Sequence, residues 1–351
     1  MSHEISIQAQ GAEIAYAGDT PWHGLGTRVE GLQTAQEMLI HAHMDWIVSA
    51  WCIEALSPSS PDENNPETIS VPEFRAIVRE DTQAILGMVS DRYMPIQNTQ
   101  AADMVDALVT EGHAHVEVAG ALGQGERCWM LARIPGEFEV VKGDAIRPYF
   151  LLAWGHDGKH GLAGKLTPIR VVCNNTLTAA GFGGKGKWSK SADVYVRHSA
   201  AAKVNIEEAR RALGLVQKQT EATQAAFQAL AAKNLDAKGK KAEKYFGTVF
   251  PEPDALTETA SLDEKASYYE KLVRWNEHQL KLLELYDQGP GTEVSGVRGT
   301  AWAAYNAITQ YTDHVYPIMK SGEVSKGRQQ SVLFGLYQGV KDRALFEALA
   351  L

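Results

Sequence analysis

The spacing of hydrophobic positions changes near Ala200. Before that residue, short runs in which hydrophobic and polar residues alternate predict β-strands, and breaker-rich stretches such as 58–66 separate them. After it, hydrophobic residues recur every three or four positions, which is typical of one face of an α-helix. The two patterns predict an α+β protein, with an antiparallel-rich sheet domain and packed helices over residues 1–200 and a mainly helical region over residues 201–351.

Local signals place individual elements in the first half. Thr34 and Glu37 form a capping-box pattern, which predicts a helix through His41. Asn98 can cap a second helix that runs to about Glu111. Strands are expected at 46–56, 74–79, 84–90, 116–121, 127–134, 138–141, 149–154 and 166–173, with a further candidate at 187–197 and a short helix at 175–180.

The hydrophobic spacing in the second half predicts four helices. They are expected at 205–235, 262–286, 300–318 and 332–349. The lysine-rich stretch at 233–244 indicates a solvated helix end or turn, and the glycine-rich stretch at 289–299 indicates a loop. The heptad pattern is too short to predict a coiled coil.

Composition narrows the class of protein. The 351 residues are 44% hydrophobic and 22% charged, which is ordinary for a globular protein. No apolar run approaches the ~20 residues of a membrane span, and the first ten residues lack the basic and apolar segments of a secretory signal. The three cysteines stand singly, without the spacing of a zinc site or a disulfide framework. We therefore expect a cytoplasmic protein that makes no membrane contact.

Charge is distributed unevenly along the chain. The whole protein carries a net charge of −9, yet residues 141–204 hold ten basic residues against three acidic ones, a net charge of +7. Within that window, lysines, an arginine and two aromatic residues follow a glycine-rich turn. An acidic protein that collects its positive charge in one window is expected to bind an anion there.

Single-stranded nucleic acid needs cations along its phosphates and aromatic faces for its bases, and each stacked base contributes ~1–3 kcal/mol. The alternative is an exposed hairpin whose aromatic residues pack locally. The glycines at 181–186 can also cradle a phosphate, although the chain lacks the P-loop pattern of nucleotide hydrolases. The candidate nucleic-acid contacts are Lys159, Lys165, Arg170, Lys185, Lys187, Trp188, Lys190, Tyr195 and Arg197.

One group of residues suits metal binding or catalysis. His156, Asp157 and His160 lie close together after a buried-type strand, and histidine and carboxylate side chains are common metal ligands. Asp157-Gly158 is also a tight-turn dipeptide, and a turn is the interpretation that we favour. His23, between a tryptophan and a glycine, can act chemically or fix a turn.

Another group lies at a predicted helix end. Asp313 and His314 can form an acid–base pair, although the helix macrodipole also explains a histidine near a helix C-terminus. None of these residues follows the spacing of a known catalytic signature. We therefore assign no catalytic residue, no metal ligand and no cofactor.

Four sequence blocks resemble a known family. PWHGLGTRVEG, RPYFLLAWGHDGKHG, TPIRVVCNNTL and RGTAWAAYNAITQYTDH occur in order between Pro21 and His314. They are similar to a family of phage- and plasmid-encoded proteins called phage/plasmid-like proteins, whose function is unknown. The resemblance implies an origin on a mobile element and a cytoplasmic setting. It supplies no catalytic residues.

A second resemblance concerns residues 29–108. A helix followed by an Asp-Trp pair and a three-strand meander resembles the Rad-fifty-two-type single-strand annealing fold. That resemblance implies a β-β-β-α core, ring assembly and a basic groove for single-stranded DNA. The characteristic aromatic and basic positions of the fold do not match residue by residue here.

These observations favour a non-enzymatic protein of a phage or plasmid that binds or anneals single-stranded DNA during recombination or replication. We expect it to be a homo-oligomer, since annealing needs a longer groove than one window supplies. One alternative is a mobile-element enzyme of nucleic-acid processing or anti-defence. The other is a protein that binds a host partner.

Overall fold

The computed structural model describes thirteen segments of the chain. The chain divides into two compact units. The first unit comprises residues 1–135, 149–166 and 192–216, and the second comprises residues 136–148, 167–191 and 217–351. The described residues are 5–17, 24–31, 33–57, 67–110, 114–170, 172, 175–176, 194–196, 206–235, 240–315, 320–321, 324–325 and 336–351.

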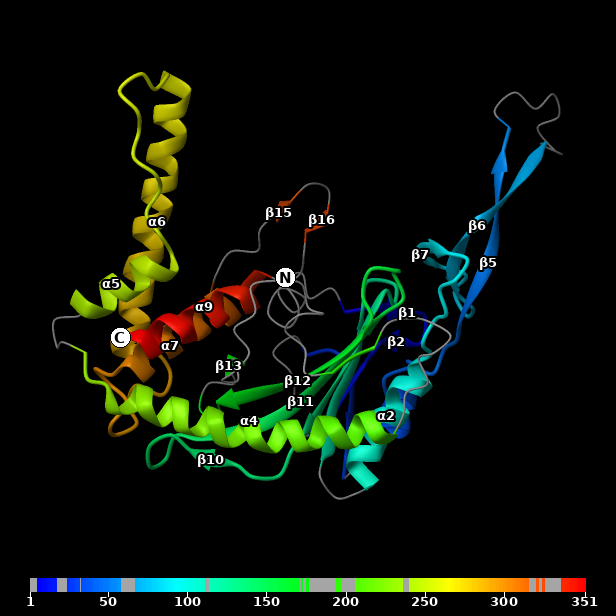
Figure 1. Ribbon diagram of the computed structural model, residues 1–351, viewed down its shortest axis with the longest axis horizontal. Coiled ribbons are helices and arrows are strands. Elements are labelled where there is room, and N and C mark those ends of the chain that lie inside the picture. Colours follow the sequence, from blue (N-terminus) through cyan, green and yellow to red (C-terminus); the bar gives the residue numbers. More distant parts are fainter. Residues whose placement is uncertain are drawn as a thin grey trace. The chain divides into compact units, whose positions relative to one another are not determined.

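A nine-stranded sheet is the largest element of the fold (Figure 1). Its main path runs β13-β12-β11-β9-β8-β3-β4, with β10 paired to β11 and β14 paired to β12. The pairing of β3 with β4 is parallel, whereas β3–β8, β8–β9 and β9–β11 are antiparallel. The strands are β3 (Ile14–Ala17), β4 (Thr27–Val29), β8 (His115–Leu122), β9 (Arg127–Arg133), β10 (Phe138–Glu139), β11 (Ala145–Gly155), β12 (Leu162–Arg170), β13 (Asn175–Thr176) and β14 (Val194–Val196).

The first unit also contains a separate three-stranded meander. Strands β5 (Val48–Leu56), β6 (Thr68–Arg79) and β7 (Ile85–Ser90) pair antiparallel in chain order. Helix α1 (Ala35–His41) precedes the meander and α2 (Asn98–Thr110) follows it. A small ribbon of β1 (Ile7–Gln8) and β2 (Gly11–Ala12) completes this unit. The element order around the meander is therefore α-β-β-β-α.

A buried charge network connects several elements of the first unit. Arg79 is fully buried and bonds to Glu13, which lies between β2 and β3, through both NH groups, and to Asp81 through Nε and one NH group. Its guanidinium also lies 4.2 Å from the ring centroid of Trp46 and donates to the carbonyl of Gln124. Paired in this way, the charge can remain in the interior.

Helices build the second unit around an aromatic core. Phe227, Tyr245, Phe246, Trp302 and Tyr305 are all buried there. Two short strands, β15 (Lys320–Ser321) and β16 (Val324–Ser325), form a separate ribbon. The helices are α4 (Ile206–Ala232), which begins in the first unit, α5 (Lys240–Val249), α6 (Leu262–Gln288), α7 (Ala301–Gln310), a π-helical turn at Tyr311–Val315, and α9 (Leu336–Ala350).

The α+β class with antiparallel-rich sheets is confirmed, with most helices in the C-terminal half. The capping box of Thr34 and Glu37 is present as predicted. One prediction was wrong: Asn175–Thr176 is strand β13 rather than helix. The helix predicted over 300–318 is present as α7 followed by the π-helical turn, and its last three positions lie outside the described residues. Helix α5 was not predicted; it begins within the stretch 233–244, where a helix end or turn was expected.

Asn98 also differs from its predicted role as a cap. Its side-chain oxygen accepts a hydrogen bond from Trp154 Nε1 at 2.7 Å, and its Nδ2 donates to the carbonyl of Met44. Long-range bonds of this kind leave no sequence signal.

Among the helices that the structure describes, none combines the length and hydrophobicity needed to cross a bilayer.

Candidate functional site

The turn that joins β11 to β12 is ordered by Asp157. One carboxylate oxygen accepts the backbone N–H groups of Lys159 at 2.9 Å and His160 at 3.1 Å. Gly158 has φ +74°, a conformation that glycine adopts without steric cost. The predicted turn at His156-Asp157-Gly158 is confirmed.

Asp157 also holds the imidazole of His160 and approaches Arg127. His160 Nδ1 lies 2.8 Å from Asp157 Oδ2, and Arg127 Nε lies 3.7 Å from the same oxygen. Burial raises the pKa of Asp157, but the hydrogen bond and charge of His160, the Lys159 amide and Arg127 outweigh it. The pKa of Asp157 is therefore below its ordinary value, and the group is a carboxylate at neutral pH.

His156 is oriented differently from His160. It is fully buried, and its Nε2 lies 3.0 Å from Asn98 Oδ1, which also accepts from Trp154. The edge of its ring meets Trp46, with centroids 5.4 Å apart. His156 therefore packs in the interior, while the side chain of His160 is 31% exposed. The two histidines do not face one common site.

An Asp–His pair of this geometry can position an imidazole for proton transfer. The same carboxylate also closes the turn, so its contacts are accounted for by local structure. Among the described residues, no three histidine, cysteine, aspartate or glutamate side chains come together as metal ligands. His23 and Cys173 lie outside the described residues, and Cys52 and Cys128 are free cysteines.

A lysine lies in the turn itself, and two tyrosines lie near it. Strand β14 pairs with β12 so that Tyr195 lies opposite Ala163, and the Tyr195 side chain is 37% exposed. Burial raises the pKa of Tyr93, and the negative charge of Asp157 and the nearby Tyr195 raise it further. Lys159 is exposed at the tip of the turn. We name Lys159, Tyr195 and His160 the turn surface.

The structure places the other predicted contacts in different settings. Lys165 lies on β12 in the first unit, as Lys159 and Tyr195 do. Unlike them it is buried, with only 5% of its surface exposed. Arg170 belongs to the second unit and is fully buried. Five predicted contacts lie outside the described residues: Lys185, Lys187, Trp188, Lys190 and Arg197.

The guanidinium of Arg170 is enclosed by other residues of the second unit. Its Nε and one NH group donate to the two oxygens of Asp144, both at 2.7 Å. Trp302 Nε1 donates to Asp144 at 2.7 Å, and the carbonyls of Pro290 and Gly291 accept from the guanidinium. A guanidinium enclosed in this way does not face a phosphate backbone, so we exclude Arg170 from the proposed contacts.

Asp313 likewise has a partner other than the neighbouring histidine. It accepts from Lys341 Nζ at 2.9 Å, and both side chains are buried. Asp313 therefore forms a buried ion pair between the π-helical turn and α9 in the second unit, and the neighbouring His314 is exposed.

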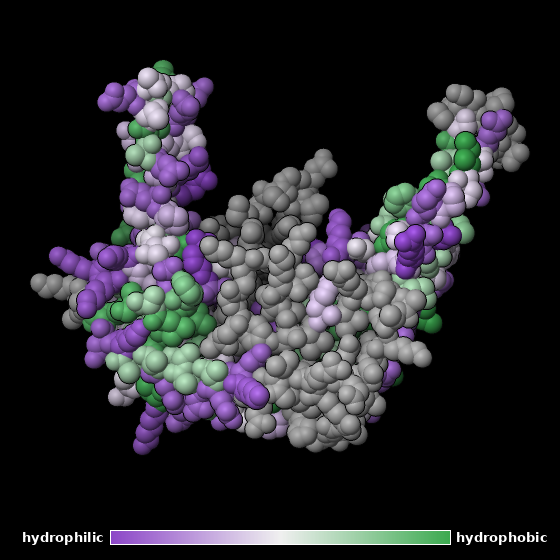
Figure 2. Space-filling view, viewed as in Figure 1, coloured by the Kyte–Doolittle hydropathy of each residue, from purple (hydrophilic) through white to green (hydrophobic). Residues whose placement is uncertain are grey.

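One surface was missed by the sequence reading. In the β5–β6–β7 register, Trp51 and Met88 flank Ala76, and Phe74 and Ile85 lie on the same face. Trp51, Phe74, Ile85 and Met88 are 45%, 48%, 67% and 65% exposed, and Figure 2 shows hydrophobic surface over β5 and β6. We name these four residues the meander face. Alternation predicted the strands but not which face stays uncovered.

The chain is similar to one family of proteins. A family model described as a domain of unknown function (DUF932) matches residues 85–333, well over half of the chain. No curated protein matches, and no solved structure matches. The matched region includes the turn surface and most of the second unit.

Proposed function

The chain belongs to the family described as a domain of unknown function (DUF932), and we propose that it is a phage or plasmid protein that binds or anneals single-stranded DNA. The observation that carries the proposal is the turn surface within the +7 window. Lys159 is exposed there and the aromatic ring of Tyr195 is partly exposed on the adjoining strand. A cation for phosphate and an aromatic face for a base are the two groups that such a ligand needs.

The order of elements gives further support. The β-β-β-α core implied by the resemblance to Rad-fifty-two-type annealing proteins requires three strands in chain order followed by a helix. Strands β5, β6 and β7 pair antiparallel in that order, and α2 follows them. Element order carries less weight than matched residues, so the turn surface remains the basis of the proposal.

The same function suggests where the protein acts and how it assembles. We propose a cytoplasmic location in the host cell, a role in recombination or replication, and assembly into a homo-oligomer. Repetition of the turn surface around a symmetric assembly would supply a longer path for DNA than one chain offers.

Paired variants test the turn surface. Lys159→Glu with Tyr195→Ala should weaken binding of a fluorescent single-stranded oligonucleotide by about tenfold or more, because it removes a phosphate contact and a stacking surface. Lys244→Glu, at an exposed position of α5, makes the same change of charge as Lys159→Glu and should have a small effect. Equal losses in the two variants would show that only net charge matters and would refute the site.

The meander face favours a second function, the binding of a host protein. Residues 48–90 hold seven acidic residues against two basic ones, so this region carries a net charge of −5 and does not suit phosphate. An exposed apolar face of this kind commonly marks a protein interface. A host protein that co-purifies with the wild type but not with Trp51→Ser/Phe74→Ser, with DNA affinity unchanged, would favour this function.

A further inference from the structure

Helix α6 leaves a line of large hydrophobic side chains uncovered. Leu262, Tyr269, Val273 and Leu280 are 84%, 59%, 57% and 68% exposed. At ~100° per residue, these four positions fall within about 40° of one another around the helix axis and span roughly 27 Å. We name them the α6 stripe. Four uncovered hydrophobic residues in one line are unusual for a surface helix and indicate a missing partner.

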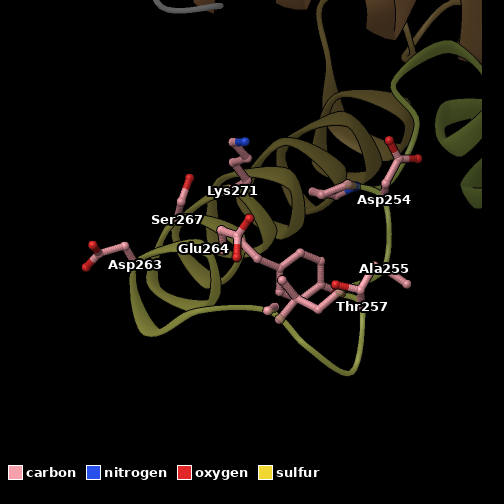
Figure 3. A pocket seen from close by; sticks show the side chains of 11 residues that line it. Asp254, Ala255, Thr257, Asp263, Glu264, Ser267 and Lys271 are labelled. Carbon is pink, nitrogen blue, oxygen red and sulfur yellow. The ribbon is translucent and has the colours of Figure 1, made fainter.

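The chain itself covers a different side of α6. The segment before the helix lies along it, and together they line a hollow of about 660 Å³ (Figure 3). Asp263, Ser267 and Lys271 line this hollow from the helix. At ~100° per residue, their positions fall on the side away from the stripe. The indole N–H of Trp275 also donates to the carbonyl of Phe250, which holds the start of the segment against the helix. The stripe is therefore not the docking site of this segment.

The spacing of the stripe is that of a coiled-coil seam. Two smaller exposed residues, Ala266 and Asn276, occupy the positions between its members. The six positions are separated alternately by four and three residues, as the d and a positions of a heptad are. The seam is Leu262, Ala266, Tyr269, Val273, Asn276 and Leu280.

The same seam is symmetric about position 271. Reversal of the chain direction around that point exchanges Leu262 with Leu280 and Tyr269 with Val273, and it exchanges Ala266 with Asn276. Two copies of α6 that run antiparallel about a two-fold axis therefore place large residues opposite large residues. They also place each asparagine opposite an alanine, which leaves room for its amide. A two-fold interface needs this kind of self-complementary surface.

We propose that α6 is a dimerisation helix, whose stripe packs antiparallel against the stripe of a second copy of this chain. The second copy is the occupant because the seam matches itself when reversed, a property that a seam for an unrelated helix has no reason to possess. The inference does not depend on DNA binding, and its tests contain no DNA.

The first test measures mass in solution. The wild type should show concentration-dependent association towards twice the 38.4 kDa of one chain. Val273→Glu/Leu280→Glu should weaken that association by about tenfold or more, since it places carboxylates in the apolar seam. Ser267→Glu/Gln288→Glu adds the same charges at exposed positions of α6 outside the seam and should associate as the wild type does.

The second test fixes the orientation. With Cys52 and Cys173 replaced by serine, a mixture of Leu262→Cys and Leu280→Cys chains should form a disulfide-linked dimer on mild oxidation. Leu262→Cys alone should not, because the two-fold separates its two thiols by roughly 27 Å along the helix axis. Efficient cross-linking of Leu262→Cys to itself would contradict the antiparallel pairing. Overlapping association curves for the seam variant and its control would contradict the interface, as would a monomer at every concentration.

Discussion

At the residue scale, the described part of the protein keeps several charges in its interior by pairing them. Arg79 bonds to Glu13, Arg170 to Asp144, and Lys341 to Asp313. Burial of an unpaired charge is costly, whereas a fully bonded pair is tolerated. The sequence showed Arg170 only as part of a basic window. Its partner Asp144 lies 26 residues away, and no local pattern connects them.

Removal of Arg79 should be strongly destabilising. Arg79→Ala leaves the buried carboxylate of Glu13 without its partner, and the free energy of unfolding should fall by about 3–5 kcal/mol. Arg79→Met with Glu13→Gln removes both charges and should recover much of that loss. Urea denaturation measures both changes. Arg274→Ala, which breaks an exposed pair with Glu270, should change stability by less than about 1 kcal/mol.

The carboxylate of Asp157 should make stability depend on pH in a defined direction. Its pKa is lower in the folded protein than in the unfolded chain. Its contribution is therefore complete above the unfolded value of ~3.9 and is lost as pH falls through the folded value. The stability difference between the wild type and Asp157→Asn should shrink between pH 6 and pH 3 in urea titrations. A difference that grows on acidification would contradict the ion-pair geometry.

At the element scale, the meander and the β11–β12 turn meet within the first unit at two glycines, one from each. A Cβ on Gly87 would lie 2.7 Å from the backbone carbonyl atoms of Asp157, and one on Gly158 would lie 2.6 Å from Val89 Cγ1. Side chains at these positions would force the two elements apart. The glycine at 158 had a turn signal in the sequence, whereas Gly87 looked like an ordinary strand residue.

Gly87→Ala should therefore lower the free energy of unfolding by about 1–3 kcal/mol, because the backbone of the turn has to move. Gly247→Ala is the matched control, since a Cβ there would meet nothing within 4 Å. Gly247 lies within α5, where alanine is the better helix former, so this variant should gain up to ~1 kcal/mol. Thermal unfolding of the two variants should shift in opposite directions.

Elements with strong local signals were predictable from the sequence. The hairpin of β8 and β9, the capped start of α1 and the long helices α4 and α6 each combine periodic hydrophobic positions with turn or cap residues. The short strands β3 and β4 lack such signals, and their pairing depends on contacts with distant segments. Helix α5 was missed because its lysines masked four buried residues: Ala242, Tyr245, Phe246 and Val249.

At the scale of the whole molecule, the positively charged surface and the two exposed hydrophobic surfaces lie in different regions of the chain. Lys159 and Tyr195 lie in the +7 window, the meander face lies in a stretch of net charge −5, and the α6 stripe belongs to the second unit. The window and the turn were predictable from the sequence. The exposure of the hydrophobic residues was not predictable, because seam residues and core residues recur along a helix with the same period. We propose separate surfaces for nucleic acid, for a second copy and, as an alternative function, for a host protein.

Binding of single-stranded DNA through the basic window can be tested by a salt-dependent titration. Fluorescence anisotropy of a labelled oligonucleotide should show binding at low salt. The logarithm of the binding constant should then fall linearly with the logarithm of salt concentration, with a slope of about −0.7 for each phosphate contacted. Absence of binding at low salt, or binding that does not change with salt, would contradict the proposed function.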